Sequence, residues 1–188
     1  MSPGEKNLYL TFDDGPVPGP TEFVLDELAR AKAKSTFFCI GDNVRKHPEV
    51  YQRIIQEGHA VGNHTFNHLS GWKTPVDAYV DNVALCDREM KREGKQPAKL
   101  FRPPYGRITR RQIGRLSEYR IVMWDVLTND YAKSLSREAC LRGSLAATRP
   151  GSIIVFHDSL KAEKNMSYVL PRFLDHFGSQ GFSFKALP

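Results

Sequence analysis

Two short segments carry the side chains with the clearest chemical potential. In Asp13-Asp14-Gly15-Pro16 two carboxylates stand side by side, although Asp, Gly and Pro are also ordinary turn formers. In His64-Thr65-Phe66-Asn67-His68 two histidines stand four positions apart, a spacing that on one helical turn places both imidazoles on the same side, about 5–6 Å apart at Cβ. Two imidazoles and a carboxylate form a three-ligand set that catalytic zinc uses, with a position left open for water. The sequence therefore predicts a divalent metal site.

Three other segments contain polar side chains suited to acid–base chemistry. Two prolines fix the backbone of Arg102-Pro103-Pro104-Tyr105-Gly106, so an arginine and a tyrosine stand at the edge of a rigid loop. Asp130 lies in Thr128-Asn129-Asp130-Tyr131, and His157 follows the apolar run Ile153–Phe156. Read alone, the Arg102 segment is explained as well by a surface turn as by a functional site, and a histidine placed like His157 is more often a structural strand-end residue than a catalyst. Their position in the fold decides between the two interpretations.

The elements that must position these residues alternate along the chain. Runs rich in β-branched and aromatic residues predict seven strands: Leu8–Phe12, Thr36–Ile40, His59–Gly62, Leu100–Arg102, Arg120–Trp124, Ile153–Phe156 and Phe182–Leu187. Stretches with helical spacing lie between them, as at Val24, Leu28 and Ala31. This alternation indicates a parallel sheet with right-handed crossovers, either a barrel or an open doubly wound sheet. No GxGxxG or Walker-type loop follows any of the strands, so the usual nucleotide-binding motifs are missing.

The candidate residues share one topological position. Each follows the carboxyl end of a predicted strand: Asp13, Asp14, His64, His68, Arg102, Asp130 and His157. In a parallel α/β barrel these strand ends converge on one face, where active sites lie. We therefore expect side chains that are far apart in the sequence to form a single site.

Composition limits the classes of function. The 188 residues are 40% hydrophobic and 26% charged, an ordinary globular balance for which we expect one domain over residues 1–188. A chain of this size needs no metal merely to fold, so a bound metal would be functional. The net charge of +6 comes from scattered basic residues, which does not favour a nucleic-acid partner. The chain shows no signal core and no apolar membrane span, so we expect a cytoplasmic location unless the chain is a processed or truncated form. We also expect a monomer.

Five ordered segments resemble the motifs of the polysaccharide deacetylases, carbohydrate esterase family 4, whose homology domain also occurs in nodulation protein B. The segments are Thr11–Pro16, His64–His68, Arg102–Tyr105, Asp130 and Val155–His157, and the similarity runs from about Asn7 to Leu187. The resemblance implies an α/β fold, a distorted parallel (β/α) barrel of about seven strands with the active site at the C-terminal strand ends. It also implies metal-dependent removal of N-acetyl, or O-acetyl, groups from a glycan that contains N-acetylglucosamine.

The resemblance implies a metal site made of three side chains. Asp14, His64 and His68 would hold a divalent metal, zinc in the first instance and cobalt or another divalent ion as alternatives. Such an ion would polarise the acetyl carbonyl and lower the pKa of a bound water.

The remaining roles that the resemblance implies concern proton transfer. Asp13 would be the general base, kept ionised and oriented by Arg102, and the Tyr105 backbone N–H would help to stabilise the oxyanion. His157, oriented by Asp130, would protonate the departing amine. Asp125 and Asp158 are alternative carboxylate partners for this histidine, because both are close in sequence to the same strand ends; neither belongs to the motifs.

The sequence departs from the family pattern around the fourth and fifth motifs. Leu127 stands where the fourth motif has an acid, and Tyr131 where it has a tryptophan. Val155 replaces the leucine two residues before the histidine of the fifth motif. These changes alter the wall of the acetyl pocket, so they affect which substrate is expected more than which reaction is expected.

Two other functions stay open beside glycan deacetylation. Relatives by fold accept small non-sugar amides, so the chain could hydrolyse a different amide or an ester. A non-catalytic glycan-binding domain that has kept the fold is the other alternative. The presence of every ionisable group that the mechanism needs argues against the latter, since Asp13 and His157 are both retained.

Overall fold

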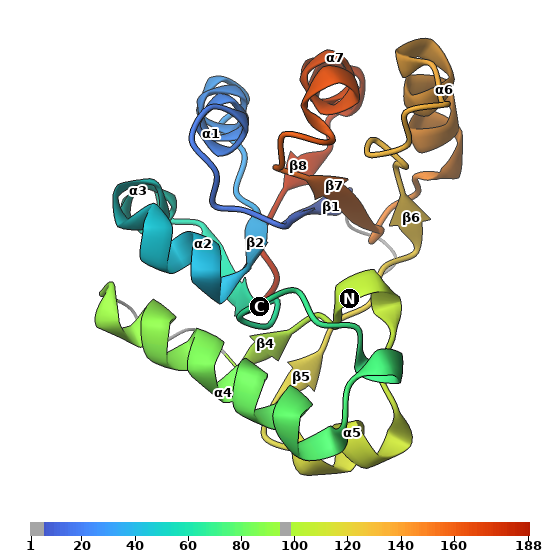
Figure 1. Ribbon diagram of the computed structural model, residues 1–188. Helices are drawn as coiled ribbons and strands as arrows, with labels where there is room; N and C mark the ends of the chain where they lie inside the picture. The colour runs from blue at the N-terminus through green and yellow to red at the C-terminus, as the bar shows by residue number, and fades with distance from the viewer. Residues whose placement is uncertain (1–5, 95–98) are drawn as a thin grey trace.

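The computed structural model describes residues 6–94 and 99–188, in which helices surround a parallel sheet (Figure 1). The strands are β1 Asn7–Asp13, β2 Thr36–Cys39, β3 Ala60–Asn63, β4 Leu100–Phe101, β5 Arg120–Ile121, β6 Val126–Leu127, β7 Ile153–His157 and β8 Ser183–Phe184. The helices are α1 Pro20–Arg30, α2 Gly41–Lys46, α3 Pro48–Gln56, α4 Val76–Arg92, α5 Arg110–Arg115, α6 Arg137–Ala147 and α7 Glu163–Ser179, with short 3₁₀ turns η1 Gly71–Lys73 and η2 Pro104–Gly106. The strand order is β5-β4-β3-β2-β1-β7-β6, and β8 pairs with the start of β1.

The sheet curls into a barrel that stays open on one side. The strands β5 and β6 form its two edges, and residues 122–125 carry the chain from one edge to the other. The Val122 N–H donates to the Phe101 carbonyl of β4 (2.8 Å), whereas the Asp125 N–H donates to the Ile153 carbonyl of β7 (3.2 Å). The predicted distorted parallel barrel is confirmed. The predicted strand Arg120–Trp124 is too long, because the chain leaves β4 after Val122, and β6 was not expected.

Alternation along β1 separates the outer core from the barrel interior. The outward residues pack in the large apolar cluster beneath the helices: Leu8, Leu10 and Phe12. Tyr9 packs on the inner side with Leu187, in a smaller cluster. Because side chains alternate with a period of two, Thr11 and Asp13 face the same interior as Tyr9. The interior is therefore apolar near the start of β1 and polar near its end.

The helices lie around the outside of the curved sheet (Figure 1). The helices α1, α7 and α6 follow one another along one part of the rim, and α2 to α5 cover the strands β2 to β5. Within the described ranges, none of these helices combines the length and apolar character needed to cross a membrane. The loops at the carboxyl ends of the strands stay free to carry a site.

Candidate metal and catalytic centre

Asp13 and Asp14 point in different directions at the end of β1. Asp13 is the last residue of the strand and is buried in the barrel interior. Asp14 has a φ of 81°, a left-handed conformation that few residues other than glycine adopt. The Asn43 side-chain amide donates to the Asp14 carbonyl (2.7 Å), and the following Gly15 N–H donates to the Asp158 carboxylate (3.0 Å). These two hydrogen bonds hold the backbone of the turn, and the Asp14 side chain points towards His64 and His68.

The two histidines lie on a loop, so the predicted helical turn is wrong. β3 ends at Asn63, and Thr65 and His68 have φ values of 64° and 56°, which no right-handed helix accommodates. Hydrogen bonds from side chains hold this loop, instead of the backbone hydrogen bonds of a helix. Asn63 Oδ1 accepts from the Thr65 N–H (2.8 Å), and Asn82 Oδ1 accepts from two further backbone N–H groups. The rings of His64 and His68 nevertheless lie 5.1 Å apart between centroids, as a chelating pair requires.

Asp14, His64 and His68 form a cluster that fits a divalent metal ion. Their ligand atoms lie within 4.8 Å of one another. Asp14 Oδ1 is 3.1 Å from His68 Nε2 and 3.7 Å from His64 Nε2, and it is buried without a hydrogen bond from the part of the chain that the structure describes. A buried carboxylate oxygen without a donor calls for a positive partner, and one carboxylate with two imidazoles is a donor set that zinc uses.

The protonation states in the cluster also suit metal binding. Burial lowers the pKa of His64 to about 4, so its imidazole is neutral at pH 7. Its Nδ1–H donates to the Arg102 carbonyl (2.7 Å), which leaves the Nε2 lone pair facing Asp14. Burial opposes the ionisation of Asp14, but contact with His68 and attraction to the His157 imidazolium hold its pKa well below the usual value. A neutral imidazole and an ionised carboxylate are the forms that bind a metal.

Arg102 lies in the barrel interior as a fully buried cation. Its Nη1 donates to Asp13 Oδ1 and to Thr11 Oγ1, both at 2.7 Å, and its Nε donates to the Val122 carbonyl (3.1 Å). The guanidinium carbon also lies 4.1 Å from the Phe38 ring centroid. Because an unpaired buried charge is costly, Asp13 and Arg102 depend on each other. Thr11 was not expected here, and its inward position two residues before Asp13 is the signal that could have indicated it.

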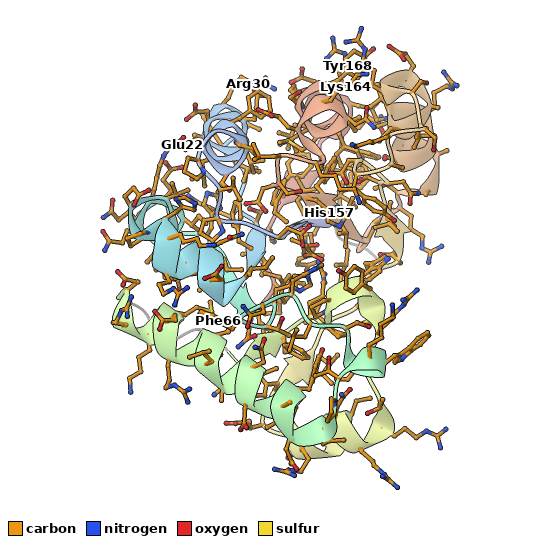
Figure 2. The ribbon with its side chains drawn as sticks, in the orientation of Figure 1. Glu22, Arg30, Phe66, His157, Lys164 and Tyr168 are labelled. Carbon is orange, nitrogen blue, oxygen red and sulfur yellow. The ribbon has the colours of Figure 1, made fainter. Side chains whose placement is uncertain are left out.

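His157 has Asp130 as its carboxylate partner. The His157 Nδ1–H donates to Asp130 Oδ1 (2.7 Å), and the backbone N–H donates to Oδ2 (2.8 Å). Burial alone would lower the pKa of His157, but Asp130, with weaker attraction from Asp13 and Asp14, raises it to about 9. The imidazole is therefore protonated at neutral pH. Figure 2 shows His157 near the middle of the molecule, whereas Tyr168 lies at the outer rim on α7.

The two alternative carboxylates have other partners. Asp125 accepts from a serine hydroxyl and from a backbone N–H at the amino end of β7, away from His157. Asp158 is buried and accepts from the Gly15 N–H (3.0 Å) and from the Thr21 hydroxyl (2.7 Å), and burial raises its pKa to about 8. Asp158 thus holds the turn that follows β1.

Tyr105 forms the outer edge of this centre. Its φ is 60°, and its backbone N–H has no hydrogen-bond partner among residues 6–94 and 99–188. Its side chain is exposed, and the ring centroid lies 4.6 Å from that of His68. The structure thus places all eight predicted site residues at the carboxyl ends of β1, β3, β4, β6 and β7.

Comparison with known proteins identifies the family. The sequence model described as Polysaccharide deacetylase matches residues 1–124. The chain belongs to this family. A peptidoglycan-N-acetylglucosamine deacetylase of Bacillus cereus is 34% identical over 182 residues, which cover 95% of this chain and 66% of that protein. A chitooligosaccharide deacetylase of Rhizobium leguminosarum bv. trifolii is 29% identical, covering 98% of this chain and 91% of that protein.

A solved structure agrees with the same assignment. The crystal structure of the Bc1960 peptidoglycan N-acetylglucosamine deacetylase superposes with a TM-score of 0.93 at 32% identity, covering 100% of this chain and 88% of that one. This polysaccharide deacetylase therefore shares the overall fold of that protein.

The departure from the family pattern at Tyr131 lies directly beside the proposed acid of this polysaccharide deacetylase. The Tyr131 ring meets the His157 imidazole edge to face, with centroids 4.9 Å apart. The Lys161 ammonium lies 5.1 Å from the same ring centroid. A phenol with a nearby cation thus lies against the His157 imidazole, at the position where the family motif has an indole.

Proposed function

We propose that this polysaccharide deacetylase hydrolyses the N-acetyl groups of N-acetylglucosamine residues in a glycan, with a divalent metal and zinc in the first instance. The observation that carries the proposal is the position of the Asp14–His64–His68 cluster beside a carboxylate and an imidazolium, Asp13 and His157. The relatives named as peptidoglycan and chitooligosaccharide deacetylases support this substrate class.

The first part of the proposal concerns the metal ligands. Asp14, His64 and His68 would hold the ion, and three protein ligands leave room for water and substrate. A divalent cation there supplies Lewis acidity, which polarises the acetyl carbonyl and lowers the pKa of water. The hydrogen bond from His64 Nδ1 to the Arg102 carbonyl fixes the ring with Nε2 towards the cluster.

Asp13 acts as the general base in this proposal. Its Oδ1 accepts from Arg102, while its Oδ2 lies 4.0 Å from His64 Nε2, on the side of the metal cluster. The guanidinium holds Asp13 in place, and an ionised carboxylate is the form that a base requires. As the water oxygen attacks the acetyl carbon, its proton passes to Asp13. The Tyr105 N–H is the chain's own donor for the carbonyl oxygen as that atom gains negative charge.

His157 acts as the general acid. Its Nδ1–H is bound to Asp130, so its Nε2–H is the proton available to the amide nitrogen. When the C–N bond breaks, this proton passes to the nitrogen, which leaves as an amine while the acetyl group leaves as acetate. The attraction of Asp130 for the imidazolium keeps His157 protonated at neutral pH, the state that a general acid requires.

Product analysis tests the proposed function. The zinc-loaded protein is incubated with chitooligosaccharides, peptidoglycan fragments and acetylated xylan, and the masses of the products are measured by mass spectrometry. We expect loss of acetyl groups from an N-acetylglucosamine substrate, and none with the Asp13→Asn variant as control. Loss from xylan alone would show O-acetyl specificity. No loss from any glycan, at full zinc occupancy, would contradict the proposal and favour a non-sugar amide or ester substrate, or a glycan-binding domain.

The oligomeric state belongs to the same proposal. A monomer remains our prediction for the chain, and light scattering on the sample used for product analysis checks it.

A further inference from the structure

Two exposed aromatic side chains flank one arginine beside the metal cluster. Trp72 is 66% exposed and Tyr105 is 61% exposed. The Arg107 guanidinium carbon lies 5.1 Å from the Trp72 ring and 6.0 Å from the Tyr105 ring centroid. We call these three residues the Trp72 platform. Exposed aromatic rings that gather in one place mark a binding surface more often than rings that are scattered singly.

Buried hydrogen bonds hold the turn that carries Trp72. The Gly71 N–H donates to the Arg107 carbonyl (3.0 Å), and the buried Gln112 amide donates to the Gly71 carbonyl (2.9 Å) and to the Thr74 carbonyl (3.1 Å). A Cβ on Gly71 would lie 2.5 Å from the Arg107 carbonyl oxygen, so this close approach needs glycine. Trp72 is therefore exposed on a turn whose backbone is fixed. The Gly71–Arg107 hydrogen bond links η1 to the residue that follows η2.

The Trp72 platform continues outward from the metal cluster. The Tyr105 ring lies 4.6 Å from that of His68, and His68 Nε2 lies 3.1 Å from Asp14 Oδ1. A glycan with one sugar unit at the metal cluster would extend its next sugar units over Tyr105 and Arg107 towards Trp72.

We propose that the Trp72 platform binds a sugar ring of the glycan beyond the unit that is deacetylated. This inference rests on the proposed function, since it assigns part of the same substrate. A pyranose presents C–H groups on its faces, which cover an aromatic ring and remove apolar area from water, while its hydroxyls stay at the edge. Arg107 supplies N–H donors at that edge, for hydroxyl or acetamido oxygens. The protein is therefore selective for chains over single acetylated sugars.

Kinetics on chitooligosaccharides of increasing length test the Trp72 platform. In the parent protein kcat/KM rises with chain length, because longer chains reach Trp72. Trp72→Ala raises KM for the pentamer by about three- to tenfold, leaves kcat nearly unchanged and leaves the dimer unaffected. Trp72→Phe restores most of the affinity, because it keeps a ring.

A matched control is available on α7. Tyr168 is also an aromatic ring covered by arginines, with Arg137 and Arg172 at 4.6 Å and 3.8 Å, and Figure 2 shows it on the outside of α7. Tyr168→Ala leaves the length dependence unchanged. Equal KM values for the parent and Trp72→Ala at every chain length would overturn the assignment.

A binding measurement separates this inference from the proposed function. The sequence has two tryptophans, so in a Trp124→Phe background the fluorescence reports on Trp72 alone. Titration with chitopentaose shifts or quenches that signal if a sugar covers the ring. A saturable change without any deacetylation supports the Trp72 platform while the proposed function fails. Deacetylation without a fluorescence change, or a change that follows protein concentration because a second copy covers Trp72, overturns the Trp72 platform.

Discussion

Asp13 at the end of β1 lies directly opposite His157 at the end of β7 in the parallel register of the two strands. Residues paired in this way point to the same face of a sheet, so both side chains enter the polar end of the barrel. Arg102 binds Asp13 from within the barrel, and Asp130 binds His157 from the loop after β6. The carboxylate and the imidazole therefore each have a partner of their own, and the two pairs can be altered separately.

The first prediction concerns Asp13. Asp13→Asn removes the proton acceptor and leaves the three candidate metal ligands in place, so we expect a loss of turnover of roughly 10²–10⁴-fold with the zinc content unchanged. Turnover on a chitooligosaccharide and zinc analysis of the same sample measure the two effects. A variant with near-parental turnover would show that another group accepts the proton.

The second prediction concerns the metal ligands. His64→Ala or His68→Ala removes one imidazole from the cluster, and each variant should lose most of its zinc after dialysis while it keeps its circular dichroism spectrum. His176→Ala is the control, since this histidine is exposed on α7, and it should keep the zinc of the parent. Stoichiometric zinc in both cluster variants would contradict the assignment of the site.

The sequence could predict where the site residues lie in the topology of the sheet. Strand ends are recognisable from short apolar runs, and parallel strands bring their carboxyl ends together, so residues as distant as Asp14 and His157 could be assigned to one face. The family motifs pointed to the same residues. The local reason for the histidine pair was wrong, because the left-handed conformations of Thr65 and His68 depend on side-chain bonds from Asn63 and Asn82. Such tertiary contacts leave no periodic pattern.

The barrel interior was harder to predict than its rim. Arginine is almost never fully buried unless it is paired, so nothing in its own segment showed that Arg102 lies inside the barrel. The run Arg120–Trp124 is uniformly apolar after its first residue, and only the crossing from β4 to β7 ends the strand at Ile121. Asp158 could not be separated from Asp130 as a partner of His157 without the positions of Gly15 and Thr21.

The third prediction concerns the stability of the buried ion pair. Arg102→Met leaves Asp13 buried without its cation, and we expect the free energy of unfolding to fall by about 3–5 kcal/mol. Arg115→Met is the matched control, because Arg115 bonds Asp77 at a similar distance of 2.8 Å but both side chains are exposed. Loss of the Arg115–Asp77 pair should lower the free energy of unfolding by about 0–1 kcal/mol. Urea unfolding of the metal-free proteins measures both values, and equal losses would contradict the role of burial.

The last prediction concerns pH and the pair of Asp130 and His157. The pKa of His157 is raised to about 9, so kcat/KM falls as the pH rises through the value at which this imidazolium loses its proton. Asp130→Asn removes the carboxylate that opposes the effect of burial, and burial lowers the pKa of His157. The alkaline limb of the pH profile therefore moves to lower pH. The acid limb, which does not report on His157, moves less.

Two variants make this pH measurement decisive. Asp125→Asn should leave the alkaline limb in place, because Asp125 binds the amino end of β7, at the opposite end of that strand from His157. Asp158→Asn should also leave it in place, since Asp158 bonds Gly15 and Thr21. Profiles of kcat/KM from about pH 5 to about pH 10 cover both limbs. An unmoved alkaline limb in Asp130→Asn, together with a shifted one in Asp158→Asn, would mean that the carboxylate following His157 in the chain, and not the one bound to its Nδ1, keeps the acid protonated.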